Sequence, residues 1–262
     1  MMDASPFLDF YLKFHEAAAV SEANALFCER VYGKNLCQQG FAEMTHLDHL
    51  IQVTGIQAGQ QVLDLGCGNG MIAEYISDRT GAAVTGVDFI QGAIHTAETR
   101  TQAKRVRLNF RVMDIAQLAF PRASFDVILS IDTLYFSDLD DSLSRMVQTL
   151  KPSGRMGIFF NQTCPPWVDL ETFPRESVHP DRTDLAQALR GMHLPYQVWD
   201  YSRQDYEHAQ RRKVVLAELK PLYEKEDRLF LYESYEGEAN GVSHAYENGV
   251  HGRYLYRVDL AT

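Results

Sequence analysis

The sequence has few cysteines and no pattern that would pair them or bind a metal. Its 262 residues include four, Cys28, Cys37, Cys67 and Cys164, without a C-x-x-C pair or a His/Cys cluster at zinc spacing. No apolar run is long enough to cross a bilayer, and the first residues carry acids where a signal peptide needs basic residues. These absences predict a reduced, cytoplasmic protein with no structural metal and no membrane attachment.

An excess of basic residues is missing as well. The formal net charge is -10 and the pI is about 5.3, so the surface repels phosphate backbones and predicts no nucleic-acid partner. The one short basic run, at residues 211–213, is flanked by acids. We interpret this run as the solvated face of a helix.

Between residues 61 and 160, short β-rich apolar runs alternate with longer helical stretches. Strands are predicted at 61–66, 82–88, 108–114, 125–131 and 154–160, and helical stretches at 70–81, 90–102 and 138–154. This alternation predicts parallel βαβ units in a doubly wound α/β sheet with helices on both faces.

The two ends of the sequence differ from this central region. Residues 1–58 predict a helical N-terminal cap on a main domain at 59–262, with amphipathic stretches at 7–20 and 41–55. Residues from about 161 to 182 are rich in Pro and Thr and predict an insertion that covers a pocket. After them the pattern predicts a helix at 183–192, a strand at 196–202, helices through about residue 247 and a last strand at 252–260.

The stretch QQVLDLGCGNGMIAEYI, residues 60–76, places an acid and three glycines between a strand and a helix. Gly66, Gly68 and Gly70 allow a sharp turn and the close approach of a ligand, and the start of the helix presents unpaired N–H groups. In a dinucleotide fingerprint the third glycine would come one residue later. Asp64, just before the loop, would suit an ammonium group better than a pyrophosphate.

Acids also end the next two predicted strands. Asp88 lies where a carboxylate can accept both hydroxyls of a ribose. Asp114 could meet the exocyclic amine of an adenine, although each acid alone could be a turn residue or a helix cap. Together the acids and glycines predict a site for a nucleoside that carries a cationic amino-acid tail.

This pattern resembles the class I, Rossmann-like S-adenosylmethionine-dependent methyltransferases of the small-molecule type. The matching segments are VLDLGCGNG (62–70), VTGVDF (84–89), VMDI (112–115), FDVILSIDTLYF (125–136) and LKPSGRMGIF (150–159). The resemblance implies a seven-stranded, mostly parallel sheet with an antiparallel C-terminal strand. It also implies S-adenosyl-L-methionine as the cofactor and S-adenosyl-L-homocysteine as the product.

The resemblance assigns a set of cofactor-binding residues. They are Asp64, Gly66, Cys67 and Gly68 for the methionine part, Asp88 for the ribose, Phe89, Met113, Asp114 and Ile115 around the adenine, and Ile131 beneath the sulfonium. Residues 31–45 resemble a segment that closes over the cofactor in methyltransferases of the phosphoethanolamine, sarcosine and quinone-biosynthesis types. By that analogy Tyr32, Gln38 and Gln39 contact cofactor or substrate; the alternative is a core tyrosine and two solvated glutamines.

The methyl acceptor is expected beyond the fourth strand, in SIDTLYFSD (130–138). Asp132 and Tyr135 are the catalytic candidates, with Tyr135 orienting the acceptor, although Asp132 could instead cap the next helix. No histidine lies between Ser130 and Ser137, where phosphoethanolamine-type enzymes carry one. The candidates for the substrate pocket are Phe136, Asn161, Trp167 and His244, and His15 lies on a helix that could fold over the site.

The favoured hypothesis is an enzyme that methylates an oxygen, nitrogen or carbon of a small molecule. A nicotinamide-dependent oxidoreductase and a catalytically silent cofactor-binding module stay open as alternatives. A macromolecule methyltransferase is disfavoured, because no N-P-P-Y-like tetrapeptide follows the fourth strand and the charge is acidic. The acceptor, the need for a general base and the oligomeric state stay open, a homodimer being one candidate.

Overall fold

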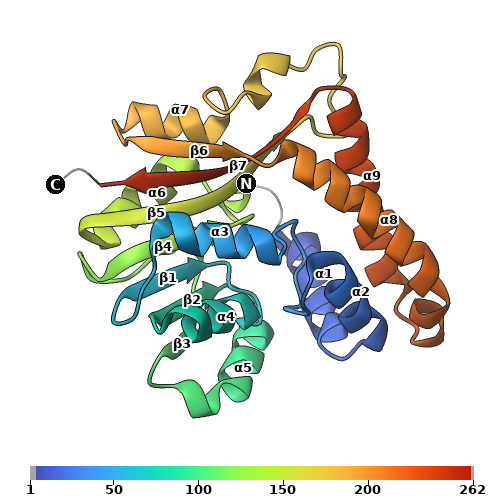
Figure 1. The fold of residues 1–262 in the computed structure, drawn as a ribbon, viewed down its shortest axis with the longest axis horizontal. Coiled ribbons are helices and arrows are strands. Elements are labelled where there is room, and N and C mark those ends of the chain that lie inside the picture. The colour runs from blue at the N-terminus through green and yellow to red at the C-terminus, as the bar shows by residue number, and fades with distance from the viewer. Residues whose placement is uncertain (1–3, 261–262) are drawn as a thin grey trace.

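Seven strands form one sheet in the part of the chain that the computed structural model describes, residues 4–260 (Figure 1). Their order is β3-β2-β1-β4-β5-β7-β6, and β7 runs antiparallel to both of its neighbours. The strands are β1 (Gln61–Leu65), β2 (Ala83–Asp88), β3 (Leu108–Val112), β4 (Phe125–Ile131), β5 (Leu150–Thr163), β6 (Tyr196–Asp200) and β7 (His251–Asp259). The predicted doubly wound, mostly parallel sheet with an antiparallel C-terminal strand is confirmed.

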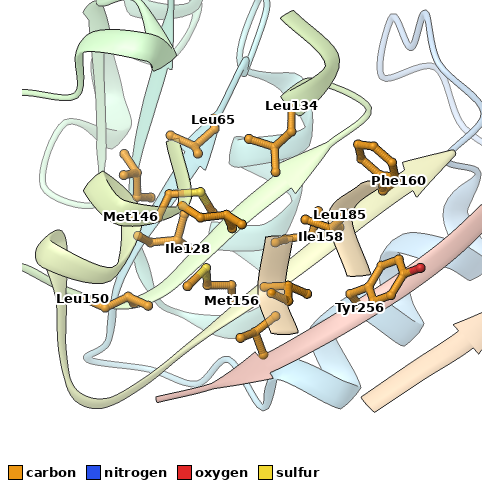
Figure 2. Close-up of a cluster of buried hydrophobic side chains, with 14 of the residues drawn as sticks. Leu65, Ile128, Leu134, Met146, Leu150, Met156, Ile158, Phe160, Leu185 and Tyr256 are labelled. Carbon is orange, nitrogen blue, oxygen red and sulfur yellow. The ribbon is translucent and has the colours of Figure 1, made fainter. Parts of the chain in front are cut away.

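Alternate residues of the central strands face opposite layers of helices, as the period of two along a strand requires. Figure 2 shows the layer in which Leu65, Ile128 and Met156 pack with Met146 of α6 (Leu139–Thr149) and Leu185 of α7 (Asp184–Gly191). The other face packs against α3 (Met44–Thr54), α4 (Met71–Thr80) and α5 (Gln91–Arg100). Both faces of the sheet are therefore covered at its centre, which explains why β1 and β4 are almost continuously buried.

The predicted helix at 138–154 is too long. The helix ends at Thr149 and β5 starts at Leu150, four residues before the predicted strand. Pro152 cannot continue the helix because it has no N–H, and Leu150 pairs with Phe125 of β4. This pairing joins residues far apart in the sequence, so local periodicity did not reveal it.

Helices from both ends of the chain form a second core. Figure 1 shows α1 (Ala4–Ala18) and α2 (Glu22–Tyr32) beside the long hairpin of α8 (Ser202–Lys225) and α9 (Leu229–Glu247), which is inserted between β6 and β7. The rings of Phe27 and Tyr235 lie 4.3 Å apart, and the buried Tyr235 hydroxyl donates to Asn24 Oδ1 and to the Gln38 carbonyl. The α8–α9 hairpin thus packs with the predicted N-terminal cap, whose boundary at residue 58 stays a prediction.

The Pro- and Thr-rich segment packs at the β7 end of α9. Cys164 and Phe173 contact Ala245 of α9 and Val250 just before β7. The short 3-10 helices of the chain are η1 (Gln102–Lys104), η2 (Ile115–Gln117), η3 (Leu134–Phe136) and η4 (Arg175–Val178). That residues 161–182 cover a pocket stays a prediction.

Two findings bear on the environment of the chain. The four cysteines are unpaired. Among the described residues, no helix combines the length and the hydropathy that crossing a bilayer requires.

The contact of α3 with β5 depends on a glycine. A Cβ on Gly157 would lie 2.6 Å from Leu50 Cδ1 and 2.6 Å from Thr54 Cγ2. The Thr54 side chain cannot turn away without loss, because its hydroxyl donates to the Leu50 carbonyl. The glycine lets the helix lie close to the sheet.

We expect Gly157→Ala to lower the free energy of unfolding by about 1–3 kcal/mol, because the added methyl group overpacks a tight core. Urea denaturation measures this change. Gly92→Ala is the matched control, since a Cβ there meets nothing within 4 Å on an exposed turn of α5. Equal losses of stability in the two variants would contradict the close packing of α3.

Candidate active site

The glycine loop between β1 and α4 needs residues without a Cβ. Gly66, Gly68 and Gly70 have φ values of +68°, +52° and +74°, in the left-handed region that favours glycine. The N–H of Gly66 donates to the Val87 carbonyl at 2.8 Å, which fixes the loop to the end of β2, and a Cβ on Gly66 would collide with Thr133. The backbone of the loop can therefore lie closer to a ligand than any side-chain-bearing residue would allow.

Asp88 is the last residue of β2, and its side chain is hydrogen-bonded to the glycine loop. Its Oδ2 accepts a hydrogen bond from the Gly68 N–H, and its Oδ1 accepts one from the Ile90 N–H, both at 2.9 Å. The side chain is buried, yet each carboxylate oxygen keeps a second lone pair. Asp88 can therefore organise the loop and still accept hydrogen bonds from a ligand.

Asp64 is a buried acid without a partner. It is 3% exposed, and its Oδ2 has no hydrogen-bond partner among the described residues. Burial raises the pKa of Asp64 to about 7, and the negative charge of Asp88 adds to the rise. A buried, unsatisfied carboxyl group is costly unless a cation or a donor approaches it. This group fits the ammonium end of the predicted cofactor.

The residues predicted around the adenine gather at the ends of β2 and β3. Phe89 is 45% exposed, and the Met113 N–H donates to the Asp88 carbonyl at 2.9 Å. Asp114 is exposed and caps η2, because its Oδ1 accepts from the Ala116 N–H at 2.9 Å. The structure thus brings Phe89 and residues 113–115 to one edge, while their contact with an adenine stays a prediction. Cys67 and Ile131 lie at the neighbouring ends of the loop and of β4.

Helix α1 covers the glycine loop. His15 Cε1 lies 3.0 Å from the position that a Cβ on Gly68 would take. Burial lowers the pKa of His15, opposed by the charge of Asp88. The Tyr11 ring lies 6.1 Å from the Phe136 ring, so α1 also meets η3 at the end of β4. The expectation that the His15 helix folds over the site is consistent with this position.

Asp132, beyond the end of β4, is the centre of a network of contacts. Its Oδ2 accepts from Arg253 Nη2 at 2.9 Å and from the Phe41 N–H at 3.3 Å, and its Oδ1 accepts from the Tyr135 hydroxyl at 3.1 Å. Its backbone has a φ of +57°, in the left-handed region that is uncommon for residues other than glycine. The alternative interpretation as a helix cap is wrong, since Thr133 precedes η3 without a capping hydrogen bond and Asp138 caps α6 through the Asp141 N–H.

Arg253 of β7 is buried between acids. Its Nη2 donates to Asp132, and its Nε lies 3.5 Å from Asp205 Oδ1, on α8. Burial raises the pKa of Asp205 despite the opposing charge of Arg253. His251 Nε2 lies 3.4 Å from Asp205 Oδ2 and extends the group toward β5. Removing one member would leave an uncompensated buried charge.

A second buried arginine, Arg212 of α8, joins the segment before α3 to α9. It donates to the carbonyls of Gln39, at 3.0 Å, and of Gly40, and to the Tyr32 hydroxyl at 2.5 Å. Its Nη1 lies 2.7 Å from Glu238 Oε2. Tyr32 is therefore the core aromatic of the alternative interpretation, and its contact with a cofactor stays a prediction.

Gln38 and the basic run at residues 211–213 correct the sequence-based expectations. Gln38 is buried, and its Oε1 accepts from the Leu36 N–H at 2.9 Å, so the solvated alternative is wrong for this glutamine. The basic run is not a uniformly solvated face, because Arg212 is fully buried while Arg211 is exposed. The carboxylate of Glu238 and three further oxygens, from Tyr32, Gln39 and Gly40, compensate the buried charge of Arg212. These partners are distant in the sequence, so no local pattern predicts them.

The four residues predicted to line the substrate pocket do not gather in one place, and they differ in exposure and contacts. Phe136 is 49% exposed beside Tyr11, and the Asn161 N–H donates to the Tyr135 hydroxyl at 3.0 Å. Trp167 is 77% exposed on the segment after β5. His244 is exposed in the last turn of α9, with its Nδ1 3.4 Å from Asn248 Nδ2. Asn161 thus contacts the Asp132 group through Tyr135, and Phe136 contacts α1 through Tyr11.

The sequence reasoning missed Tyr11, Arg212, Glu238 and Arg253. Each lies in a helix or strand whose pattern is ordinary, and no motif marks it. The sequence hints at Arg212 alone, because this arginine belongs to the basic run at residues 211–213; it lies on the buried face of α8.

A hollow of about 630 Å³ lies elsewhere along the same edge of the sheet. It is open to solvent and is lined by residues such as Asp200, Tyr246 and Tyr254, without a member of the glycine loop. It lies beside β6 and β7 and shares His251 with the Asp205 group, but none of its lining residues is a predicted site residue. No group of three or more His, Cys, Asp or Glu residues in the described part of the chain is arranged to hold a metal ion.

Known proteins resemble this chain in its central region and in its fold. A family model described as a methyltransferase domain matches residues 62–154. Methyltransferase GfsG of Streptomyces halstedii is 31% identical over 114 residues, which cover 42% of this chain and 41% of that protein. Phosphoethanolamine N-methyltransferase 1 of Zea mays is 32% identical over 129 residues, which cover 49% of this chain and 25% of that protein. The matches thus span less than half the length of these curated relatives.

A solved structure extends the likeness to the whole chain. Geranyl diphosphate C-methyltransferase from Streptomyces coelicolor A3(2) superposes with a TM-score of 0.71 over 100% of both chains, at 14% identity. At this identity the likeness supports the fold alone.

The sheet order, the glycine loop and the acids at successive strand ends define a class I, Rossmann-like methyltransferase domain. The match over residues 62–154 shows a methyltransferase domain in this part of the chain, and the relatives named above are methyltransferases. The sequence-based prediction of this class is confirmed.

The shifted pKa of Asp64 predicts a dependence of stability on pH. The folded protein keeps the Asp64 proton up to about pH 7, whereas the unfolded chain loses it near its ordinary pKa of 3.8. Between these values the native state binds more protons, so the free energy of unfolding falls as the pH rises, by about 4 kcal/mol in total. Above about pH 7 the loss is complete and constant.

Asp64→Asn carries no titrating group and should lack this contribution. Urea denaturation of both proteins without ligand, from about pH 4 to about pH 8, should show the variant gaining stability relative to wild type as the pH rises. Parallel pH profiles would contradict the raised pKa. The comparison of slopes is unaffected by a constant cost of the new amide.

Proposed function

We propose that the protein transfers a methyl group from S-adenosyl-L-methionine to a small-molecule acceptor and releases S-adenosyl-L-homocysteine. The observation that carries the proposal is the buried, unpartnered carboxyl of Asp64 directly before the glycine loop. A phosphate would be repelled there, whereas an ammonium group would satisfy it. The family model and the relatives named above are methyltransferases, which supports methyl transfer over a nicotinamide-dependent oxidation.

The residues at the strand ends provide complementary groups for each part of the cofactor. Asp64 and the backbone of Gly66 to Gly68 would hold the amino-acid end, and the free lone pairs of Asp88 would accept the ribose hydroxyls. Phe89 and residues 113–115 would border the adenine. When bound, the cofactor supplies a methyl carbon that its sulfonium activates toward a nucleophile.

The protein's own part in such a reaction is to align the acceptor and to exclude water. Tyr135 is suited to orient an acceptor as a hydrogen-bond acceptor, because its hydroxyl donates its proton to Asp132, accepts from the Asn161 N–H and keeps a second lone pair. Asp132 is committed to Arg253 and to the Phe41 N–H, so it supports the acceptor region by holding its walls. Tyr11 and His15 of α1 would close the site from above.

The relatives' names do not determine the acceptor, because they include enzymes of phosphoethanolamine and of geranyl diphosphate. The missing histidine between Ser130 and Ser137 argues against phosphoethanolamine itself. Function depends on the pocket rather than on the fold, so the acceptor must be argued from this chain's residues.

We also propose a reducing, cytoplasmic location for the enzyme. Four unpaired cysteines support it, since oxidising compartments favour disulfides. A homodimer stays a prediction, which light scattering of the purified chain would test.

Cofactor binding is the first test of the proposed function. At about one hundred times its dissociation constant, S-adenosylmethionine or S-adenosylhomocysteine should add about 2.7 kcal/mol of stability. For a chain of this size the melting temperature should rise by roughly 5–10 °C. Thermal denaturation measures the shift, and NAD should cause none. A shift with NAD alone would refute the proposal.

Asp88→Asn tests the assigned ribose contact. One carboxylate oxygen becomes a donor, so the affinity for S-adenosylhomocysteine in calorimetry should fall by about ten- to one hundred-fold. Asp169→Asn, on the segment after β5, is the control and should bind as wild type does. Unchanged affinity in the Asp88 variant would remove this residue from the site.

A further inference from the structure

His15 of α1 lies directly against the glycine loop and has a ring nitrogen without a partner. Its Cε1 lies 3.0 Å from the position that a Cβ on Gly68 would take, and its Nε2 and Nδ1 lie 3.8 Å and 3.9 Å from the same position. The ring edge that faces the loop therefore carries both nitrogens, one on either side of Cε1. Nδ1 is buried and makes no hydrogen bond within the described part of the chain. Such a nitrogen is costly unless a ligand or a water molecule meets it.

Asp88 contacts the same residue of the loop through the backbone. Its Oδ2 accepts from the Gly68 N–H at 2.9 Å, while the imidazole ring of His15 meets Gly68 on the side where a Cβ would stand. Each oxygen of Asp88 keeps a second lone pair. Asp88 and His15 thus flank one glycine, and a ligand group that reaches the carboxylate beside Gly68 comes close to the imidazole as well.

The position of α1 favours the ribose over the amino-acid end of the cofactor. Helix α1 packs against α5, which starts at Gln91, shortly after Asp88, and against α9. Asp64, which is assigned to the amino-acid end, lies in β1 before the loop. His15 therefore contacts the loop next to the acid that is assigned to the ribose.

A ribose hydroxyl matches both side chains at once. Burial lowers the pKa of His15 below its ordinary value of 6.5, although the charge of Asp88 opposes the shift, so the ring is neutral near neutral pH. A neutral imidazole has one N–H donor and one nitrogen that accepts. A hydroxyl can donate its proton to the Asp88 carboxylate and accept a hydrogen bond from the N–H of His15. A deoxyribose offers no such group at the position that lacks the hydroxyl.

We propose that His15, through a ring nitrogen, binds a ribose hydroxyl of S-adenosylmethionine together with Asp88, and that this contact makes the site selective for ribose over deoxyribose. The inference rests on the proposed function, because it takes Asp88 as the ribose-binding acid. It makes α1 a source of a polar contact to the cofactor and not merely a cover. A ligand without the hydroxyl would leave polar groups of the site unpaired, which is the arrangement that discriminates strongly between such ligands.

The test uses the full chain and calorimetry with S-adenosylhomocysteine and its 2′-deoxy and 3′-deoxy analogues. For wild type, the loss of the contacted hydroxyl should weaken binding by about ten- to one hundred-fold. His15→Phe keeps a ring on Gly68 and removes both nitrogens. This variant should bind S-adenosylhomocysteine about tenfold more weakly, while the deoxy analogue should bind it as it binds wild type.

Three controls separate this contact from other effects. 5′-Methylthioadenosine keeps the ribose but lacks the amino-acid end, and His15→Phe should weaken its binding as much as that of S-adenosylhomocysteine. His15→Asn, with an amide near the position of Nδ1, should discriminate against the deoxy analogue more strongly than His15→Phe does. His95→Phe, at an exposed position of α5, should bind every ligand as wild type does. Thermal denaturation checks the folding of each variant, and His15→Leu replaces His15→Phe if the latter does not unfold cooperatively.

The same penalty for each missing hydroxyl in wild type and in His15→Phe would overturn the inference. A loss confined to ligands that carry the amino-acid end would overturn it too, because it would place His15 at that end of the cofactor. If wild type does not bind S-adenosylhomocysteine, the proposed function fails, and the inference fails with it. If wild type binds S-adenosylhomocysteine but His15 shows no coupling to either hydroxyl, only the inference fails.

Discussion

The peptide group between Gly40 and Phe41 lies between the buried Arg212 and the partly buried carboxylate of Asp132, and much of the site depends on this arrangement. Its carbonyl accepts from Arg212 and its N–H donates to Asp132. Taking such charges out of water is costly, and only well-placed partners compensate for the cost. The partners come from α8, the segment before α3 and the end of β4. Burial of Arg212 and its contact through the peptide group to Asp132 are therefore favourable only when these three regions pack together.

The hairpin of α8 and α9 is the element that makes this meeting possible. It leaves the sheet after β6 and returns into β7, so it carries Arg212 and Glu238 to the helices of the N-terminus. The same return delivers Arg253 on β7 to Asp132. The antiparallel strand β7 thus positions Arg253, one of the two buried arginines.

The acids of the site differ in how far they are satisfied. Asp88 and Asp132 each accept several hydrogen bonds from the protein, so they hold backbone and side chains in place. Asp64 keeps an oxygen without a partner. The difference separates acids that organise the site from an acid that a ligand would satisfy. The sequence motifs alone do not distinguish Asp64 from Asp88 and Asp132 in this respect.

The sequence by itself determined the parallel sheet and the glycine loop, because both arise from local patterns. Short apolar, β-rich runs marked β1 to β4 to within two residues, and the spacing of Gly66, Gly68 and Gly70 marked the turn. Asp64 and Asp88 were predictable because they stand beside those strands. Only the tertiary structure decided that Arg212 is buried, that Asp132 is not a helix cap and that α1 covers the loop. These outcomes depend on contacts between segments many residues apart, and a buried charge leaves no periodic signal along its own helix or strand.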